Sequence, residues 1–483
     1  MAARPPIITI LGHVDHGKTT LLDTLRKSRI AAREHGGITQ RIGAYELPTN
    51  IKGYETDKVT FIDTPGHEAF TMLRSRGANV ADIAILVIDA KDSLKPQTVE
   101  SISHIKNAKI PYIVALNKID LPDANPNKVK NDLLKHEVMT EDKGGTVPVV
   151  EISAKTGKGT NELLESLLLM AADLNLTYDP EKPAIAYIIE TKKDKRGAVA
   201  SAIIKDGTLK VGDAIFADQQ KSKIRALIND LGESVKQVVP STPFEIIGFE
   251  ELPEVGTVIQ TSASTDVKDA VTSSTTRKIT DVASFLVAPV QEKKLAAIIK
   301  TDSQGSLDAI KYSLGKNDGI DIILAGVGDV HRSDVFLAKT TKAIIIGFSV
   351  KSDNEVVELA KQEKVIIKTY NIIYELLDEL TEVSRLIQEK EEKEKNLKGE
   401  AKVVATFMIE GEKIFGVKVT KGKMNLGDSI DVYRDDKKFS KTKLISLKHR
   451  AKAINEVKKD MDAGMIFSPA LDLRVGDVVK SVL

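Results

Sequence analysis

The sequence contains no cysteine and no tryptophan, and aromatic residues make up only 4% of its 483 residues. The absence of cysteine excludes disulfide bonds and thiolate metal sites. The small number of aromatic side chains argues against a surface that binds nucleic acid mainly by stacking its bases.

Long apolar runs and an excess of one charge are also missing. The longest candidate runs, residues 83–88 and 343–348, have the length of strands, whereas a membrane-spanning helix needs about 20 apolar residues. The 70 basic and 69 acidic residues leave a net charge of +1, so any contact with RNA must rest on local basic patches. The first apolar run begins at residue 7, and we therefore expect no signal or transit peptide and a cytoplasmic location.

The composition that remains, 42% hydrophobic and 29% charged, is that of a globular protein, and the length predicts about three or four domains. Residues 1–176 alternate between strand and helix patterns, which predicts a parallel sheet covered by helices on both faces. The expected strands are 7–11, 58–62, 82–88, 111–116 and 147–152, and the expected helices are 18–27, 68–77, 96–107, 126–136 and 160–172.

A glycine-rich loop follows the first of these strands. The order strand, Gly-x-x-x-x-Gly-Lys-Thr and helix is the context that a phosphate-binding loop requires, because glycines let amide N–H groups converge on one anion at a helix N-terminus. Lys18 can reach the β- and γ-phosphates, and the Thr19 hydroxyl can bind Mg²⁺. The expected phosphate site consists of Gly12, His13, Val14, Asp15, His16, Gly17, Lys18, Thr19 and Thr20.

Two further motifs carry groups suited to a γ-phosphate and its metal ion. Thr39 ends a Gly-Gly-Ile-Thr stretch in a long loop, and it can complete Mg²⁺ coordination. Asp63 ends a predicted strand and can bind Mg²⁺ directly or through water, while the N–H of Gly66 can reach a γ-phosphate. His67 can orient an attacking water; the alternative is a residue at a helix N-terminus that packs locally.

The last two motifs of this domain predict guanine recognition. Asp120 ends Asn-Lys-Ile-Asp, and its two acceptor oxygens match the adjacent N1–H and 2-amino donors of guanine, a pair that adenine lacks. A backbone N–H of Ser-Ala-Lys after the last strand can meet the guanine oxygen. The expected guanine site consists of Asn117, Lys118, Asp120, Ser153, Ala154 and Lys155.

The rest of the chain divides by pattern into four further parts. Residues 177–262 show the short apolar runs and turns of an all-β barrel. Nine residues from Gly207 to Ile215 recur in similar form from Gly422 to Ile430, so residues 400–483 are predicted to be a second barrel. Residues 263–370 are predicted to form a connector and an αβα domain. Residues 371–399 are predicted to contain a long helix, of which some 24 residues would span about 36 Å, and an interaction tail is the alternative.

Together these motifs resemble the G domain of translational GTPases. Three stretches, residues 36–45, 63–70 and 117–126, resemble bacterial translation initiation factor two, in a short form without the long amino-terminal extension common in that family. The resemblance implies a P-loop GTPase domain, two translation-type β-barrels, an αβα domain and a long connecting helix. It implies that His67 positions water on the ribosome and that Val14 and Ile38 form an apolar gate around it.

The resemblance extends to the last barrel, which is similar to one that holds the aminoacylated 3′ end of initiator tRNA. Lys448 and Gly464 keep the family pattern, whereas His449, Asp462 and Ala463 depart from it. Val417 stands where the family pattern has a cysteine, which leaves recognition of a formyl group open. The residues expected at this tRNA site are Lys448, His449, Asp462, Ala463 and Gly464.

The resemblance implies a monomeric, ribosome-stimulated GTPase that uses GTP/GDP and Mg²⁺. Its implied partners are both ribosomal subunits and initiator Met-tRNA, formylated or not, and its implied role is to promote subunit joining. An elongation-type tRNA-delivery GTPase is the first alternative, against which the predicted αβα domain and long helix argue. A ribosome-assembly GTPase with little turnover is the second, against which His67 argues.

Overall fold

The computed structural model describes residues 2–27, 39–49, 51–218, 220–261, 294–316, 319–409, 412–435, 437–450 and 452–482. The chain forms two compact units, one of Met1–Asp281 with Leu295–Thr381, and the other of Val282–Lys294 with Glu382–Leu483. Among the helices in these described ranges, none is both long and apolar enough to cross a membrane.

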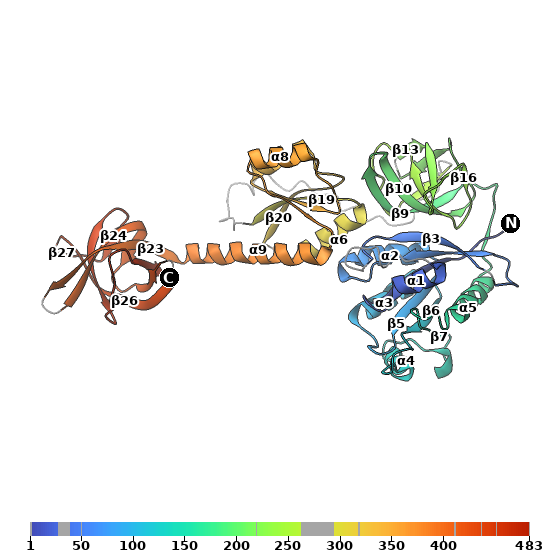
Figure 1. Cartoon of the computed structure of the whole chain (residues 1–483), viewed down its shortest axis with the longest axis horizontal. Coiled ribbons are helices and arrows are strands. Elements are labelled where there is room, and N and C mark those ends of the chain that lie inside the picture. Colours follow the sequence, from blue (N-terminus) through green and yellow to red (C-terminus); the bar gives the residue numbers. More distant parts are fainter. Residues whose placement is uncertain are drawn as a thin grey trace, which may run out of the picture. The chain divides into compact units, whose positions relative to one another are not determined.

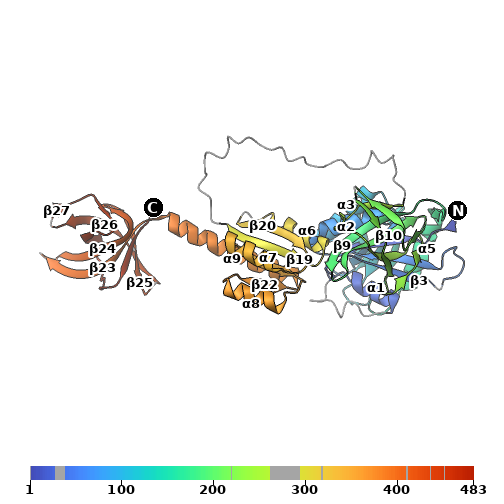
Figure 2. The ribbon, with the colours of Figure 1, turned by 90° about the horizontal axis from the view of Figure 1, so that it is seen from above.

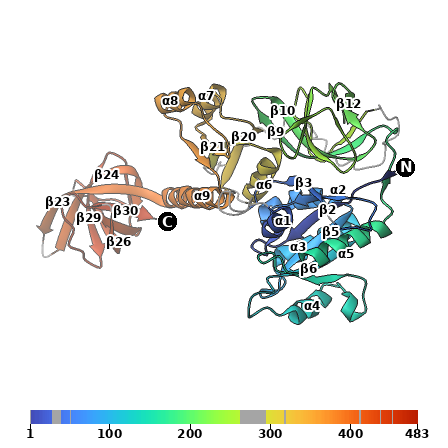
Figure 3. The ribbon, with the colours of Figure 1, turned by 45° about the vertical axis from the view of Figure 1, so that its right-hand side comes forward.

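The first part of unit 1 is a sheet between two layers of helices, as predicted, with six strands where five were predicted (Figure 3). The sheet order is β3 (Gly43–Pro48), β4 (Lys58–Asp63), β2 (Ile7–Gly12), β5 (Ile83–Asp89), β6 (Tyr112–Asn117) and β7 (Val149–Glu151). One face packs against α1 (Lys18–Arg26) and α5 (Thr160–Asp173). The other packs against α2 (Thr71–Val80), α3 (Pro96–Ala108) and α4 (Pro126–Leu134).

Strands β2, β4, β5, β6 and β7 pair in parallel, so the motifs that follow them meet at one edge of the sheet. The predicted strands and helices of residues 1–176 are confirmed. The edge strand β3, which pairs antiparallel with β4, was not predicted. Its residues, Gly-Ala-Tyr-Glu-Leu-Pro, are mostly half-exposed and lack a continuous apolar run, and proline is tolerated at an edge.

The second part of unit 1 is the predicted first β-barrel (Figure 1). It wraps an antiparallel sheet of eight strands around its own apolar core. The strands of this sheet are β9 (Ile185–Asp194), β10 (Gly197–Asp206), β12 (Ala214–Ala217), β13 (Gln220–Lys223), β14 (Ala226–Asn229), β15 (Ser234–Val235), β17 (Pro243–Ile247) and β18 (Val258–Gln260). Two short strand pairs lie outside this sheet. They are β11 (Leu209–Lys210) with β16 (Gln237–Val238), and β1 (Ala2–Ala3) with β8 (Thr177–Tyr178).

The third part of unit 1 is an αβα layer structure, with its layers seen from the side in Figure 1 and from above in Figure 2. Its parallel sheet has the order β20 (Ile320–Val327), β19 (Leu295–Thr301), β21 (Ile344–Phe348) and β22 (Ile367–Tyr370). Helix α6 (Gln304–Leu314) and the start of α9 (Ile373–Lys395) pack on one face, and α7 (Arg332–Thr341) and α8 (Asn354–Gln362) on the other. These layers are those of the αβα domain predicted within residues 263–370, although neither α8 nor β22 was predicted as a separate element.

Unit 2 contains the last barrel, in which six strands close into a ring. The order is β23 (Leu397–Ile409), β30 (Val478–Val482), β25 (Ser429–Arg434), β26 (Lys437–His449), β29 (Asp462–Ser468) and β24 (Glu412–Asn425), and β24 pairs again with β23. Short strands β27 (Lys452–Ala453) and β28 (Glu456–Lys458) pair with β26 and β24.

The sequence repeat between the two barrels corresponds to a repeated turn. The Asp213 carboxylate accepts a hydrogen bond from the Lys210 amide at 2.8 Å, and the Asp428 carboxylate accepts one from the Asn425 amide at 2.9 Å. The glycine before each aspartate has a left-handed φ, 99° and 90°, which favours glycine. The repeated Gly-Asp pair therefore specifies the same turn in both barrels.

One apolar cluster joins the three parts of unit 1. It contains Phe70 and Leu73 from the segment after β4, Ile189 from the barrel, Ile310 from α6 and Leu376 from α9. All five side chains are at most 2% exposed. The segment that follows Asp63 is therefore packed against three elements that come much later in the sequence.

Candidate nucleotide-binding site

Most of the predicted nucleotide-site residues within the described ranges line one cleft at the carboxyl edge of the G-domain sheet. Its two halves share Gly17, Thr20 and Lys118. The first half is lined by Val14, Asp15, Gly17, Lys18, Thr19, Thr20, Thr39, Gly66, His67, Lys118 and Tyr374. The second half is lined by Gly17, Thr20, Asn117, Lys118, Asp120, Leu121, Ala154 and Lys155.

The glycine loop has the backbone shape that an anion site needs. Asp15 and Gly17 adopt left-handed φ values of 61° and 90°, and α1 begins at the next residue without any side chain capping its first turn. A Cβ at Gly17 would lie 2.3 Å from the Asn117 Nδ2 atom. The free N–H groups and the dipole of α1 suit a bound phosphate.

The loop contains two histidines, and burial lowers the pKa of both. His16 is 1% exposed, and its Nδ1 atom lies 3.3 Å from the Asp89 amide nitrogen. Burial, helped by the nearby His13 and Lys18, lowers the pKa of His16 to about 4, so this ring is neutral at physiological pH. The His16 side chain therefore faces the protein, and only its backbone N–H is left for an anion.

Lys18 lies against the strand-to-helix turn that contains Gly66. Its Nζ atom donates a 2.6 Å hydrogen bond to the His13 carbonyl. Burial lowers the pKa of Lys18 to about 8, although the charge of Asp63 opposes this shift. A Cβ at Gly66 would lie 2.4 Å from that Nζ atom and 2.9 Å from the Val14 nitrogen, so only glycine fits at this position.

Thr39 lies within hydrogen-bonding distance of both other predicted magnesium ligands, Thr19 and Asp63. The hydroxyl oxygens of Thr19 and Thr39 are 2.6 Å apart, and the Thr39 hydroxyl donates to the Asp63 carboxylate at 3.3 Å. No group of three histidine, cysteine, aspartate or glutamate residues suited to a metal occurs in the described ranges. A donor set of one carboxylate and two hydroxyl oxygens is hard and fits Mg²⁺ rather than a softer metal.

At the other half of the cleft, Asn117 connects two loops. Its Nδ2 atom donates to the His16 carbonyl and its Oδ1 atom accepts from the Ala154 amide, both at 2.8 Å. The side chain is 1% exposed. Asn117 therefore sets the distance between the glycine loop and the Ser-Ala-Lys loop, and the Ala154 amide is already bonded to it.

Asp120 and Lys118 are the charged groups of this half. Asp120 is exposed, and a hydrogen bond from the Ser153 hydroxyl lowers the pKa of its carboxyl group. Lys118 has a left-handed φ of 64°, and its Nζ atom lies 2.7 Å from the Asp89 carboxylate. Both residues line the cleft where a base would bind.

His67 fits both interpretations made from the sequence, because it packs locally at the start of a helix and also lines the cleft. Its Nδ1 atom accepts a 2.8 Å hydrogen bond from the Ala69 amide, which caps the short 3₁₀ helix Glu68–Phe70. The ring also lines the cleft, 4.2 Å from the Tyr374 ring between centroids. Burial lowers the pKa of His67; the charge of Glu68 opposes this shift and that of Arg74 adds to it.

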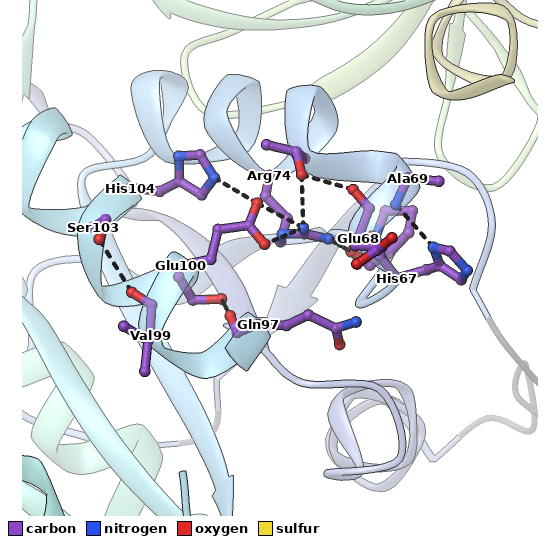
Figure 4. Close-up of polar contacts among 12 residues, drawn as sticks. His67, Glu68, Ala69, Arg74, Gln97, Val99, Glu100, Ser103 and His104 are labelled. Atoms are coloured by element: carbon purple, nitrogen blue, oxygen red, sulfur yellow. Dashed lines mark hydrogen bonds and ion pairs between the residues drawn. The ribbon is translucent and has the colours of Figure 1, made fainter. Parts of the chain in front are cut away.

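A buried arginine holds the backbone on both sides of His67 (Figure 4). Arg74 is 0% exposed and donates to the carbonyls of Pro65 at 3.0 Å and His67 at 2.6 Å. Its other nitrogen donates to both oxygens of the Glu100 carboxylate at 2.8 Å. Burial alone would raise the pKa of Glu100, but hydrogen bonds from His104, Thr71 and Arg74 bring it to about 2.

The predicted gate is described only in part. The Val14 amide donates to the Gln97 side chain at 3.3 Å, which ties the glycine loop to α3. Ile38 lies outside the described residues. Arg74, Gln97, Glu100 and Tyr374 were not predicted from the sequence. The one sequence signal for this group was the charge of Arg74 next to the apolar Leu73 on the buried face of α2.

The predicted tRNA residues lie together on neighbouring strands of the last barrel. Lys448 pairs with Gly464, and Gly464 pairs with Gly416 on the next strand. The His449 Nδ1 atom lies 2.6 Å from the Asp462 carbonyl oxygen. Lys448 and Asp462 are exposed, whereas Ala463 is 5% exposed and packs in the core beside Val417.

Three family models match the sequence in chain order. Residues 4–173 match the elongation factor Tu GTP binding domain, residues 183–262 match elongation factor G domain 2, and residues 268–381 match translation-initiation factor 2. The translation initiation factor IF-2 of Halothermothrix orenii is 42% identical over 99% of this chain and 71% of the relative. The chain belongs to the translation initiation factor IF-2 family.

Other IF-2 relatives are longer than this chain. The protein of Nitratiruptor sp. is 43% identical and that of Bartonella tribocorum 40%, over 99% and 100% of this chain, and the chain spans 58% and 59% of their lengths. Among solved structures, GDP-bound aIF5B from Aeropyrum pernix aligns over 100% of this chain and 92% of its own, with 27% identity and a TM-score of 0.48.

Because Arg74 makes these buried contacts in this IF-2 family member, we expect its replacement to lower the stability of the fold strongly. Arg74→Met keeps the apolar stem but removes the donor of the buried Pro65 carbonyl, one donor of the His67 carbonyl and the bidentate partner of the Glu100 carboxylate. We expect the free energy of unfolding to fall by about 3–5 kcal/mol, measured by urea denaturation. Arg76→Met on the same helix removes a partly exposed ion pair with Asp308 and should cost about 1 kcal/mol or less. Equal losses in the two variants would contradict the role of Arg74.

Proposed function

We propose that this chain is a translation-initiation GTPase that binds GTP in the described cleft and hydrolyses it on the ribosome. The observation that carries the proposal is the convergence of phosphate, metal and base motifs on one edge of the sheet. The alignment of the whole chain with IF-2 proteins supports the same assignment.

In this proposal the glycine loop, the start of α1 and Lys18 hold the β- and γ-phosphates. The Gly66 amide would bind the γ-phosphate, and the closeness of Gly66 to both Lys18 and the Val14 nitrogen supports this role. Mg²⁺, held by Thr19, Thr39 and Asp63, would neutralise charge on the phosphate oxygens. These cationic and N–H groups stabilise the charge that moves onto the leaving phosphate.

His67 is the residue that would orient the attacking water. Its Nδ1 atom accepts from a backbone amide, so the neutral ring carries its proton on Nε2. In a side-chain position that faces the γ-phosphate, this Nε2–H would hold the oxygen of the attacking water. Arg74 fixes the His67 backbone, and binding to the ribosome would supply the side-chain position in which hydrolysis is fast.

The proposed partners are both ribosomal subunits and initiator Met-tRNA, with the factor acting as a monomer in the cytoplasm. The last barrel would contact the aminoacylated end of the tRNA through the strands that contain Lys448 and Gly464. An elongation-type delivery factor is the second candidate, because residues 4–173 and 183–262 match elongation-factor models. The match of residues 268–381 to translation-initiation factor 2 favours initiation.

Base selection can be tested by Asp120→Asn. The amide cannot accept from both the N1–H and the 2-amino group, so GTP affinity should fall about 100-fold. Xanthosine triphosphate has an oxygen in place of the 2-amino group, so its affinity should rise, as measured by fluorescent-nucleotide displacement. Asp123→Asn, which removes an exposed charge nearby, is the matched control. Unchanged GTP affinity in Asp120→Asn would exclude guanine recognition by this carboxylate.

Hydrolysis can be tested by His67→Ala. GTP affinity should stay close to that of the parent protein, while ribosome-stimulated single-turnover hydrolysis should fall at least about 100-fold because the water is no longer oriented. His67→Gln should recover part of the rate, since glutamine can orient water. His136→Ala, on the far side of α4, serves as the control. Unchanged stimulated turnover in His67→Ala would remove His67 from the mechanism.

Binding of tRNA can be tested with the full chain and initiator Met-tRNA, with and without the formyl group. Lys448→Ala should weaken binding and reduce the slope of log K against log salt by about 1, because one phosphate contact is lost. Lys459 is an exposed lysine elsewhere on the same barrel, and Lys459→Ala should change neither the affinity for tRNA nor the salt slope. Preference for the formylated form would establish formyl recognition, equal binding would exclude it, and no binding to either form would remove initiator tRNA from the function.

A further inference from the structure

Although α9 follows the αβα domain in the sequence, its first turn contributes to the cleft that contains His67. Tyr374, the second residue of α9, lines the phosphate half of the cleft. Its ring centroid is 4.2 Å from that of His67, with 53° between the ring planes. The proposed mechanism gives Tyr374 no role so far.

Two contacts hold the His67 side chain where it is. The Ala69 amide occupies its Nδ1 atom, and the Tyr374 ring lies against its imidazole. Phe70 makes a looser edge contact at 6.1 Å. Any rotation of the His67 side chain breaks the hydrogen bond to Ala69 and changes the contact with Tyr374.

Tyr374 is held in place by its neighbours. Ile373 and Leu376 are fully buried in the apolar cluster that also contains Phe70. The Gln40 side chain accepts from the Ile373 amide at 3.0 Å and donates to the Asn371 carbonyl at 2.9 Å. The first turn of α9 is thereby attached to the segment that contains Thr39 and lies against the segment that contains His67.

The Tyr374 side chain itself is 39% exposed, so it is not a core residue. Burial, with the nearby charges of Asp15 and Glu68, raises the pKa of its hydroxyl, which stays neutral at physiological pH. The contact with His67 is therefore one between two uncharged rings. Removing the Tyr374 ring should leave the buried face of α9 intact.

We propose that Tyr374 is a positioning residue for the hydrolysis step, which restrains His67 in its helix-capping orientation until the first turn of α9 moves. The inference deepens the proposed GTPase function and depends on it. With the ring in place, the His67 rotamers that face the γ-phosphate are sparsely populated, so hydrolysis is slow. Displacement of Tyr374 removes one of the two contacts that hold the imidazole and raises the population of those rotamers.

The test is single-turnover GTP hydrolysis by the full chain without ribosomes, at a series of GTP concentrations. Tyr374→Ala should raise the maximal rate about fivefold, the scale that loss of one aromatic pair permits, with the GTP concentration for half-maximal rate unchanged. Tyr374→Phe keeps the ring and should retain the slow rate. Tyr312→Ala removes a similarly exposed tyrosine on α6 and should change nothing.

The double variant His67→Ala/Tyr374→Ala separates a role through His67 from a general loosening of the fold. Its rate should not exceed that of His67→Ala. Three results would each overturn the proposal. The hydrolysis rate could rise even without His67, it could rise equally in Tyr374→Phe, or it could stay unchanged or fall in Tyr374→Ala. A parallel reaction with ribosomes tests the proposed function itself, since parent protein that hydrolyses no GTP there contradicts the GTPase assignment instead.

Discussion

The apolar cluster around Phe70 determines where the candidate site can form. Phe70 and Leu73 follow the Asp-Thr-Pro-Gly-His motif directly, and they pack against the first barrel, α6 and α9. Close-packed interiors resist small displacements, because each shift opens voids or creates overlaps. The segment that contains His67 is therefore positioned as much by residues 185–380 as by the G domain that it belongs to.

Polar contacts around this cluster give the three parts of unit 1 a defined orientation. Arg4 binds the Asp82 carboxylate at 2.7 Å and the Ser241 hydroxyl of the barrel at 3.1 Å. Glu190 of the barrel is buried, which raises its pKa, and it accepts the Gly305 amide at the start of α6 at 3.0 Å. Apolar packing alone lets the three parts of unit 1 slide against one another. Each of these directional hydrogen bonds opposes sliding, because a shifted part would leave a buried polar group unpaired.

Much of the fold could be predicted from the sequence, because buried parallel strands are continuous apolar runs and the barrels repeat a Gly-Asp turn. Strands β3 and β22 were missed, since each is a short, half-exposed strand at the edge of its sheet, so its pattern is weak. Helix α8 was missed although Val356, Leu359 and Ala360 keep the spacing of one helix face. The cleft was predictable because all of its motifs except the one that contains Thr39 follow a parallel strand. The contacts of Tyr374 were not, because they depend on how α9 packs on a domain that begins more than 300 residues earlier.

The two restraints on His67 differ in kind, and the difference bears on how the site can change state. Arg74 is fully buried and binds the backbone carbonyl of His67, so its contacts persist unless α2 unfolds. The side chain is held only by one amide and by a ring that is partly exposed to solvent. A rigid backbone with a weakly held side chain allows the imidazole to change orientation at little free-energy cost while the cleft keeps its shape. Control of hydrolysis would then depend on the small contact with α9 and not on rearrangement of the phosphate loop.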